Sequence, residues 1–146
     1  MIALDTNILI YAYNRAAPES PAAAKAVGKA REDARGWGVA FPVLAEFWSV
    51  ATSPAHAEPA SARRVQRYWQ ELRQGGLQIW TPSDETGAAL LAVASRHAVR
   101  GRRIYDLQIA MIALENGADE IWTHDAEFLR VPGLKYFDPI SHSAGR

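Results

Sequence analysis

The chain has 146 residues, contains no cysteine, and carries 16 basic and 16 acidic residues, so its formal net charge is zero. This length suits one domain with a buried core, and the lack of cysteine excludes disulfide frameworks, zinc–thiolate sites and cysteine nucleophiles. A hydrophobic share of 49% with 22% charged residues is typical of a globular chain and not of a disordered one.

No segment has the pattern of a membrane span or a secretory signal. The longest stretch without Asp, Glu, Lys or Arg is residues 47–57, which contains Pro54 and is shorter than the roughly 17–25 apolar residues of a span. The first residues contain no basic group and reach Asp5 at once, unlike a signal peptide. We therefore expect a cytoplasmic protein without a membrane partner.

Zero net charge conceals an uneven distribution. Residues 60–103 carry eight arginines against three acids, whereas residues 104–146 carry three basic groups against seven acids. Of the 16 basic residues 13 are arginine, whose planar guanidinium suits phosphate. The overall balance therefore does not exclude a nucleic-acid partner.

Short apolar runs alternate with longer helical segments along the chain. Strands are expected at residues 2–4, 37–41, 77–80, 120–123 and 134–137. Helices are expected at residues 8–13, 19–34, 42–51, 59–74, 84–98 and 104–116, with a helical turn at 126–129. This order predicts an α/β fold, a parallel sheet with helices on both faces, over residues 1–140, followed by a short tail at 141–146.

Four acids stand in unusual surroundings. Asp5 and Asp125 follow predicted strands, and open parallel sheets bind ligands at the carboxyl ends of their strands. Asp106 begins an apolar helix, and the apolar neighbours of Glu46 make its full exposure difficult. Each also has a structural interpretation: Asp5 and Asp125 as helix N-caps, Asp106 as a helix-dipole partner, Glu46 as a solvated side chain.

If the strand ends converge, these carboxylates share one cleft. Two unit charges 4 Å apart repel by about 4 kcal/mol at an effective dielectric near 20, so such a cluster needs compensating cations. Oxygen ligands without His or Cys favour Mg²⁺ or Mn²⁺. A metal that activates water beside an arginine-rich segment suits phosphodiester hydrolysis.

These motifs resemble those of PIN-domain proteins, most closely the ribonuclease toxins of VapBC-type toxin–antitoxin systems. The resemblance is carried by Asp-Thr-Asn-Ile at 5–8, Glu46, Arg-Gly-Arg-Arg-Ile-Tyr-Asp at 100–106, Thr-His-Asp at 123–125 and Phe128, and it spans residues 1–137. It implies a three-layer α/β/α fold with about five parallel strands. It also implies a homodimer, an Mg²⁺- or Mn²⁺-dependent endoribonuclease that leaves 3′-hydroxyl and 5′-phosphate ends, and a cognate antitoxin.

The resemblance also assigns roles to individual residues. It places Asp5, Glu46, Asp106 and Asp125 at the four acidic catalytic positions of the family. The first three would bind the metal directly or through water, and Asp125 would hold a second metal or contact the first through water. Supporting polar roles fall to Thr6, Asn7 and Thr123. Thr6 and Asn7 stand in the opening motif, where a polar residue could orient Asp5 or a metal-bound water, and Thr123 fills the Ser/Thr position two residues before Asp125.

Further side chains near these motifs have open roles. Arg100, Arg102 and Arg103 could bind RNA phosphates or form a solvated loop. Tyr11 and Tyr13 could stack on a base, although core packing is the commoner role of such residues. His124 should point away from the site if Thr123 and Asp125 point into it.

Three other functions fit the sequence less well. A PIN nuclease could process RNA without an antitoxin. An aspartyl-phosphate phosphatase of haloacid-dehalogenase type would use Asp5 as nucleophile, but it needs a second Asp where Asn7 stands and a lysine in the site. A non-catalytic binding module would not need all four acids.

Overall fold

The computed structural model describes residues 1–143, so residues 144–146 of the expected tail lie outside the described part. Five parallel strands form one sheet in the order β3-β2-β1-β4-β5. The strands are β1 (Ile2–Leu4), β2 (Trp37–Ala40), β3 (Gln78–Trp80), β4 (Glu120–Trp122) and β5 (Lys135–Phe137). The predicted α/β class with a parallel sheet is confirmed.

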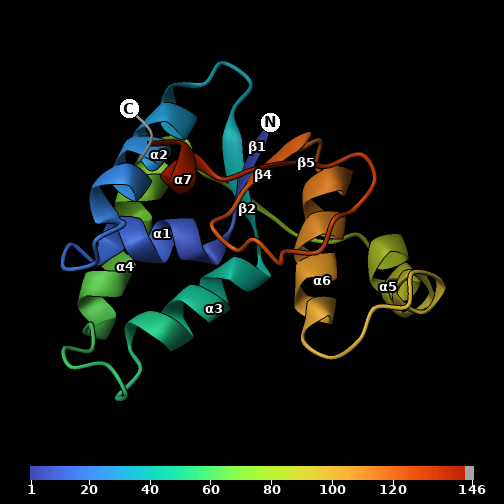
Figure 1. The fold of residues 1–146 in the computed structure, drawn as a ribbon, viewed down its shortest axis with the longest axis horizontal. Coiled ribbons are helices and arrows are strands. Elements are labelled where there is room, and N and C mark those ends of the chain that lie inside the picture. Colours follow the sequence, from blue (N-terminus) through green and yellow to red (C-terminus); the bar gives the residue numbers. More distant parts are fainter. Residues whose placement is uncertain (144–146) are drawn as a thin grey trace.

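Helices cover both faces of this sheet (Figure 1). In the view of Figure 1, α1, α2, α4 and α7 lie on one side and α5 and α6 on the other, with α3 below. The helices are α1 (Thr6–Tyr13), α2 (Ser20–Glu32), α3 (Pro42–Ala51), α4 (Ala62–Gln74), α5 (Asp84–Arg96), α6 (Arg103–Glu115) and α7 (Pro139–Ser143). None of the helices within residues 1–143 is long and apolar enough to cross a membrane.

The centre of the sheet forms the core. Every residue of β1 and β2 is buried, because both faces of these strands are covered by helices. The outer strands β3 and β5 carry exposed or half-buried residues. The largest fully buried side chains include Phe47 of α3, Ile8 and Leu9 of α1, and Leu107 of α6, so these three helices are held against the sheet by apolar packing.

The strand order reverses at β1. The chain runs outward from β1 through β2 to β3, then returns to place β4 on the other side of β1, and β5 beyond it. The register aligns Leu4 with Trp122, so the residues that follow β1 and β4 emerge side by side. This is the topological switch point at which open α/β sheets bind their ligands.

The structure differs from the predicted elements in two places. The helical turn expected at residues 126–129 is absent: residues 126 and 127 form a turn that the Phe128 N–H closes on the Asp125 carbonyl at 3.1 Å, and residues 128 and 129 are irregular. The Leu129 N–H donates to the Asp106 carboxylate, 3.2 Å away, and does not continue a helix. The short helix α7 was not predicted. It begins after Asp138, whose carboxylate accepts from the N–H groups of Ile140 and Ser141 at 3.0 and 3.2 Å.

Candidate active site

Asp5 lies at the switch point, immediately after β1. Its backbone N–H donates to the carbonyl of Trp122 at 3.0 Å, and its side chain is only 7% exposed. The carboxylate caps α1 by accepting from the Thr6 N–H at 2.7 Å. The N-cap interpretation is therefore confirmed, and the same carboxylate also faces a pocket.

Thr123 and Asn7 hold the second oxygen of Asp5. The Thr123 hydroxyl donates to Asp5 Oδ2 at 2.7 Å, and Asn7 Nδ2 donates to the same oxygen at 2.9 Å. Asn7 Nδ2 also donates to Thr123 Oγ1 at 3.0 Å, and Asn7 Oδ1 accepts from the His124 N–H at 3.0 Å. Thr123 Oγ1 accepts from the Asp125 N–H at 3.1 Å as well. This network joins the ends of β1 and β4.

The side chain of Thr6 does not hold Asp5, as the sequence had suggested it could. Its backbone N–H holds Asp5, but its own hydroxyl is buried and finds no hydrogen-bond partner among the described residues. The Thr6 side chain therefore does not orient Asp5. It lines the pocket instead, with an unsatisfied polar atom.

One pocket of about 790 Å³ is lined by the four predicted acids and also by Glu127. Asp106, half-buried in the first turn of α6, accepts from the Leu129 N–H, and Asp125, exposed after β4, accepts from the Glu127 N–H at 2.8 Å. Glu46 lines the α3 side and is exposed, contrary to expectation. Its neighbours Val43 and Phe47 turn into the core, which leaves Glu46 on the pocket side of the helix.

Negative charge dominates the pocket, because carboxylates outnumber the guanidinium groups that line it. Burial raises the pKa of Asp5 to about 6, against the lowering effect of its hydrogen bonds from Thr123 and Thr6. The charges of Glu46 and Asp106 raise it further. Burial also raises the pKa of Asp106, against the Leu129 N–H, and the charges of Asp125 and Glu46 add to the rise. A cation in the pocket would relieve this repulsion.

The donor set fits a hard divalent cation. The pocket is lined by five carboxylates, those of the four predicted acids and of Glu127, and carboxylate oxygens are donors that Mg²⁺ and Mn²⁺ prefer. No three His, Cys, Asp or Glu side chains of residues 1–143 already stand together as a ready metal-ligand group. The carboxylates would have to move inward or reach the ion through water, which suits Mg²⁺ because it keeps several waters.

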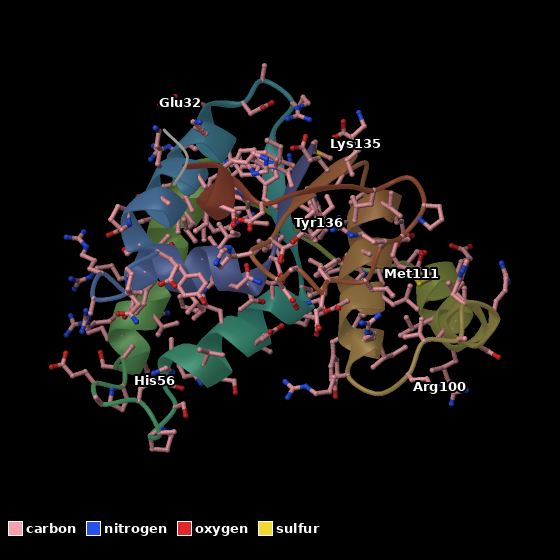
Figure 2. The ribbon with its side chains drawn as sticks, in the orientation of Figure 1. Glu32, His56, Arg100, Met111, Lys135 and Tyr136 are labelled. Carbon is pink, nitrogen blue, oxygen red and sulfur yellow. The ribbon has the colours of Figure 1, made fainter. Side chains whose placement is uncertain are left out.

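Two of the three predicted arginines reach the pocket. Arg102 and Arg103 line it, are exposed, and form no ion pair with another described residue. The charge of Arg103 acts to lower the pKa of Asp106. Arg100 is not among the lining residues, and Figure 2 shows it toward α5, on the far side of α6 from α3.

The aromatic side chains near the Asp5 motif have two different environments. Tyr13 packs against the rings of Phe47 and Tyr68, with centroids 5.5 and 5.1 Å away, so it belongs to the core. Tyr11 lines the pocket and meets the ring of His124 edge-on at 5.8 Å. His124 itself points away from the pocket, as predicted, and its Nδ1 contacts the Asp138 carboxylate at 3.0 Å.

The sequence did not point to Glu127, Tyr105 or Gln108, which also line the pocket. Tyr105 and Gln108 lie on α6 near Asp106, and Arg102, Tyr105 and Ile109 recur at the spacing of one helix face. That spacing could have indicated a shared surface. It could not have shown that the surface faces a pocket, because this depends on how α6 packs beside α3.

The fold and the site define a class: an open parallel α/β domain with a carboxylate-lined pocket at its topological switch point. Within this class the chain belongs to the PIN domain family, whose model matches residues 2–134. PIN domains are nucleases that hydrolyse RNA, so the chain belongs to a family of enzymes.

Individual relatives agree with this family. Ribonuclease VapC24 of Mycobacterium tuberculosis is 28% identical, and the match covers 97% of this chain and 98% of the relative. Among solved structures, the sarcin-ricin-loop-cleaving toxin VapC20 of M. tuberculosis matches with a TM-score of 0.68 at 13% identity, covering 88% of this chain and 92% of that one. VapBC2 from Rickettsia felis, bound to a promoter DNA fragment, matches with a TM-score of 0.64 at 21% identity, covering 94% and 98%. These structural likenesses establish the fold.

Proposed function

We propose that this PIN domain is an Mg²⁺- or Mn²⁺-dependent endoribonuclease that acts as the toxin of a toxin–antitoxin pair. One observation carries the enzymatic part. Four separate parts of the chain supply carboxylates to a single pocket: the end of β1, α3, the first turn of α6, and the segment after β4, which carries both Asp125 and Glu127. Charges gathered in this way are unfavourable unless cations compensate them.

The roles proposed for the acids are those that the family resemblance implies. Asp5, Asp106 and Glu46 would hold the cation directly or through water, and Asp125 would hold a second ion or contact the first through water. When bound, the cation supplies activation of a water molecule and stabilisation of the charge that develops on the phosphate. The pocket carboxylates must be ionised for this, and burial raises the pKa of Asp5, so metal binding should weaken as the pH falls.

The protein's own groups hold this arrangement in place. Thr123 and Asn7 direct Asp5 Oδ2, and the Leu129 N–H directs the Asp106 carboxylate. On the rim, Arg102 and Arg103 are exposed guanidinium groups, which suit the phosphates on either side of the scissile bond.

The test is cleavage of RNA by the purified chain. With Mg²⁺ or Mn²⁺ we expect internal cleavage with 5′-phosphate and 3′-hydroxyl ends, and no cleavage with EDTA. Asp5→Asn and Asp106→Asn should lose the activity, whereas Glu85→Gln, which changes an exposed acid of α5 outside the pocket, should keep it. Equal rates in all four proteins would contradict the assignment.

The toxin role is supported by the relatives. The matching structures include VapBC2 and a toxin–antitoxin complex from Klebsiella pneumoniae, the latter with a TM-score of 0.64 at 17% identity. We propose by analogy that this chain forms a homodimer and binds an antitoxin that places a basic side chain in the acidic pocket. A small neighbouring gene whose product neutralises growth inhibition by this chain would support the role. Its absence would favour an RNA-processing nuclease.

The phosphatase alternative loses support at Asn7. A phosphatase of that type needs a second acid at this position, but Asn7 donates its amide to Asp5 Oδ2, and the pocket of the described chain is lined by no lysine. A non-catalytic binding module would not explain why carboxylates from several elements line one pocket. Calorimetry that detects no Mg²⁺ or Mn²⁺ binding would favour such a module.

A further inference from the structure

Tyr105 is a large aromatic side chain left exposed at the mouth of the pocket. It lies in the first turn of α6, directly before Asp106, and 59% of it is exposed. The large exposed hydrophobic residues of the described chain are Phe41, Trp48, Leu91 and Tyr105. Of these, Tyr105 alone lines the pocket.

The side chain of Tyr105 has no specific interaction partner within residues 1–143. Its hydroxyl makes no hydrogen bond and its ring no aromatic or cation–π contact with another described residue. The other pocket tyrosine, Tyr11, is half-buried against His124. Tyr105 is therefore the aromatic face that the pocket offers to a ligand.

The charges beside Tyr105 indicate the class of this ligand. Arg102 lies one helical turn before Tyr105 on the same face of α6, and Arg103 lies between them in the chain. Neither guanidinium is paired within the described residues. An aromatic ring next to unpaired cations is the combination by which proteins bind single-stranded nucleic acid, with bases stacked and phosphates neutralised.

The opposite wall of the pocket suits the rest of a nucleotide. Pro42, Ala45 and Val50 of α3 line that wall with apolar surface. The volume of about 790 Å³ exceeds what a phosphate group and its ions would fill and falls in the range of roughly 300–1,000 Å³ of pockets that hold whole small molecules. There is thus room for a base and its ribose beside the carboxylates.

We propose that Tyr105 is a specificity residue that stacks on an unpaired base next to the scissile phosphate. The contact needs a base that is unpaired, because a base inside a duplex has both faces covered by its neighbours. This inference rests on the proposed ribonuclease function, since it names the residue of the same site that holds a base.

The first experiment measures stacking without cleavage. A single-stranded oligoribonucleotide that contains 2-aminopurine is titrated with the wild-type protein, Tyr105→Ala and Tyr105→Phe in EDTA. We expect the wild type and Tyr105→Phe to quench the fluorescence. Tyr105→Ala should bind about 10-fold more weakly and with little quenching. Equal quenching by all three proteins would overturn the proposal.

Trp48→Ala is the matched control. Trp48 is another exposed aromatic residue, but it lies two residues after Glu46 on α3, which places it about 200° around the helix. It does not line the pocket, so its removal should leave binding and quenching unchanged. If Trp48→Ala has the same effect as Tyr105→Ala, the stacking is not specific to Tyr105.

The second experiment pairs the protein change with a change in the RNA. After the cleavage site of a mixed-sequence single strand is mapped, each flanking base is replaced by an abasic residue. At one flanking position the abasic RNA should raise KM for the wild type about 10-fold. The same abasic RNA should not raise KM for Tyr105→Ala above the value that this variant has with intact RNA. The kcat of both proteins should be nearly unchanged. Additive effects at every position would overturn the proposal.

The outcomes separate the two claims. RNA that is bound through Tyr105 but never cleaved supports the stacking and contradicts the proposed nuclease. RNA that is cleaved equally well by the wild type and Tyr105→Ala supports the nuclease and contradicts the stacking. Sedimentation of the wild type and Tyr105→Ala compares their oligomeric states. If Tyr105→Ala loses binding together with a change of oligomeric state, Tyr105 belongs to an interface between copies and the proposal fails.

Discussion

At the scale of single residues, the site contains one buried carboxylate, Asp5, among acids that are half-buried or exposed. Asp5 is 7% exposed, and burial raises its pKa from 3.8 to about 6. A carboxyl with a higher pKa in the folded than in the unfolded chain is protonated more readily when folded. Its effect therefore favours folding at low pH and weakens the metal-free fold as the pH rises through about 4 to 6.

Asp5→Asn should therefore stabilise the metal-free protein at neutral pH. The shift of about two pKa units corresponds to about 3 kcal/mol, and we expect a gain of roughly 1–3 kcal/mol near pH 8 because Asn keeps only part of the hydrogen bonds. Near pH 4 the gain should nearly vanish. Urea unfolding in EDTA at both pH values measures it, with Glu85→Gln as control. A loss of stability near pH 8 would contradict the argument.

Thr123 should be more sensitive than its size suggests. Its buried hydroxyl donates to Asp5 and accepts from Asn7 and from the Asp125 N–H. Thr123→Val removes these three bonds and leaves Asn7 as the one side-chain donor to Asp5 Oδ2. It should cost roughly 1–3 kcal/mol of unfolding free energy, and it should weaken metal binding.

Thr123→Ser is the matched control, since it keeps the hydroxyl and loses one methyl group. Thermal unfolding and calorimetry with Mn²⁺ should rank wild type and Thr123→Ser well above Thr123→Val in metal affinity. If the valine variant binds Mn²⁺ as well as the serine variant does, the hydroxyl does not position Asp5.

The sequence predicts the acidic residues of this site better than it predicts the aromatic and hydroxyl side chains that lie beside them. Asp5 and Asp125 could be found because each follows an apolar strand, and parallel strands end at the same edge of a sheet. Tyr105 could not, because its exposure depends on how α6 and α3 are spaced. The unsatisfied Thr6 hydroxyl could not be foreseen either, since its partners depend on tertiary contacts.

At the scale of elements, the segment after β4 is held from several sides. The His124 N–H donates to Asn7, and the His124 ring contacts Asp138. The Tyr136 hydroxyl donates to the Asp125 carbonyl at 2.7 Å. Alternation of apolar runs predicts the strands that frame this segment, but the segment itself is irregular and is shaped by side chains from distant parts of the chain.

Asp138 links α7 to this segment. Burial acts to raise its pKa, but hydrogen bonds from Ser141, His124 and Ile140 outweigh it, so the pKa of Asp138 lies below its usual range. The ionised carboxylate therefore supports the fold above the unfolded pKa, and this support is lost as the pH falls through the lower folded value.

Asp138→Ala should loosen the C-terminal helix. Loss of the cap typically costs about 1 kcal/mol, and we expect faster hydrogen exchange at residues 139–143 and at His124. Glu58→Ala, an exposed acid in the loop before α4, is the control. Unchanged exchange in the Asp138 variant would show that α7 is held by its packing on α2 and not by this carboxylate.

At the scale of the whole molecule, the zero net charge conceals an uneven distribution of acidic and basic residues. The 16 acidic and 16 basic residues cancel over the whole chain, although acids gather at the pocket and eight arginines lie within residues 60–103. Arg102 and Arg103 stand at the pocket, whereas Arg100 does not line it. The sequence predicts this separation of charge along the chain, and the fold decides which arginines face the carboxylates.

The dependence of RNA binding on salt should reflect this arrangement. Each phosphate contact contributes about 0.7 to the slope of log K against log salt concentration for a single strand. Arg102→Ala and Arg103→Ala should each reduce the slope by about that amount, and Arg100→Ala should reduce it less. Filter binding of a single-stranded RNA over a range of salt concentrations measures the three slopes. Three equal reductions would assign the RNA surface to the whole loop.

The most direct test of the central claim is the rate of RNA cleavage as a function of Mn²⁺ concentration. We predict a saturable rise for the wild-type protein and the Glu85→Gln control, no measurable rise for Asp106→Asn, and no rise for any of them in EDTA. Cleavage by Asp106→Asn with the wild-type dependence on Mn²⁺, or cleavage by the wild type that is indifferent to Mn²⁺ and EDTA, would contradict the assignment of this pocket as a metal-dependent ribonuclease site.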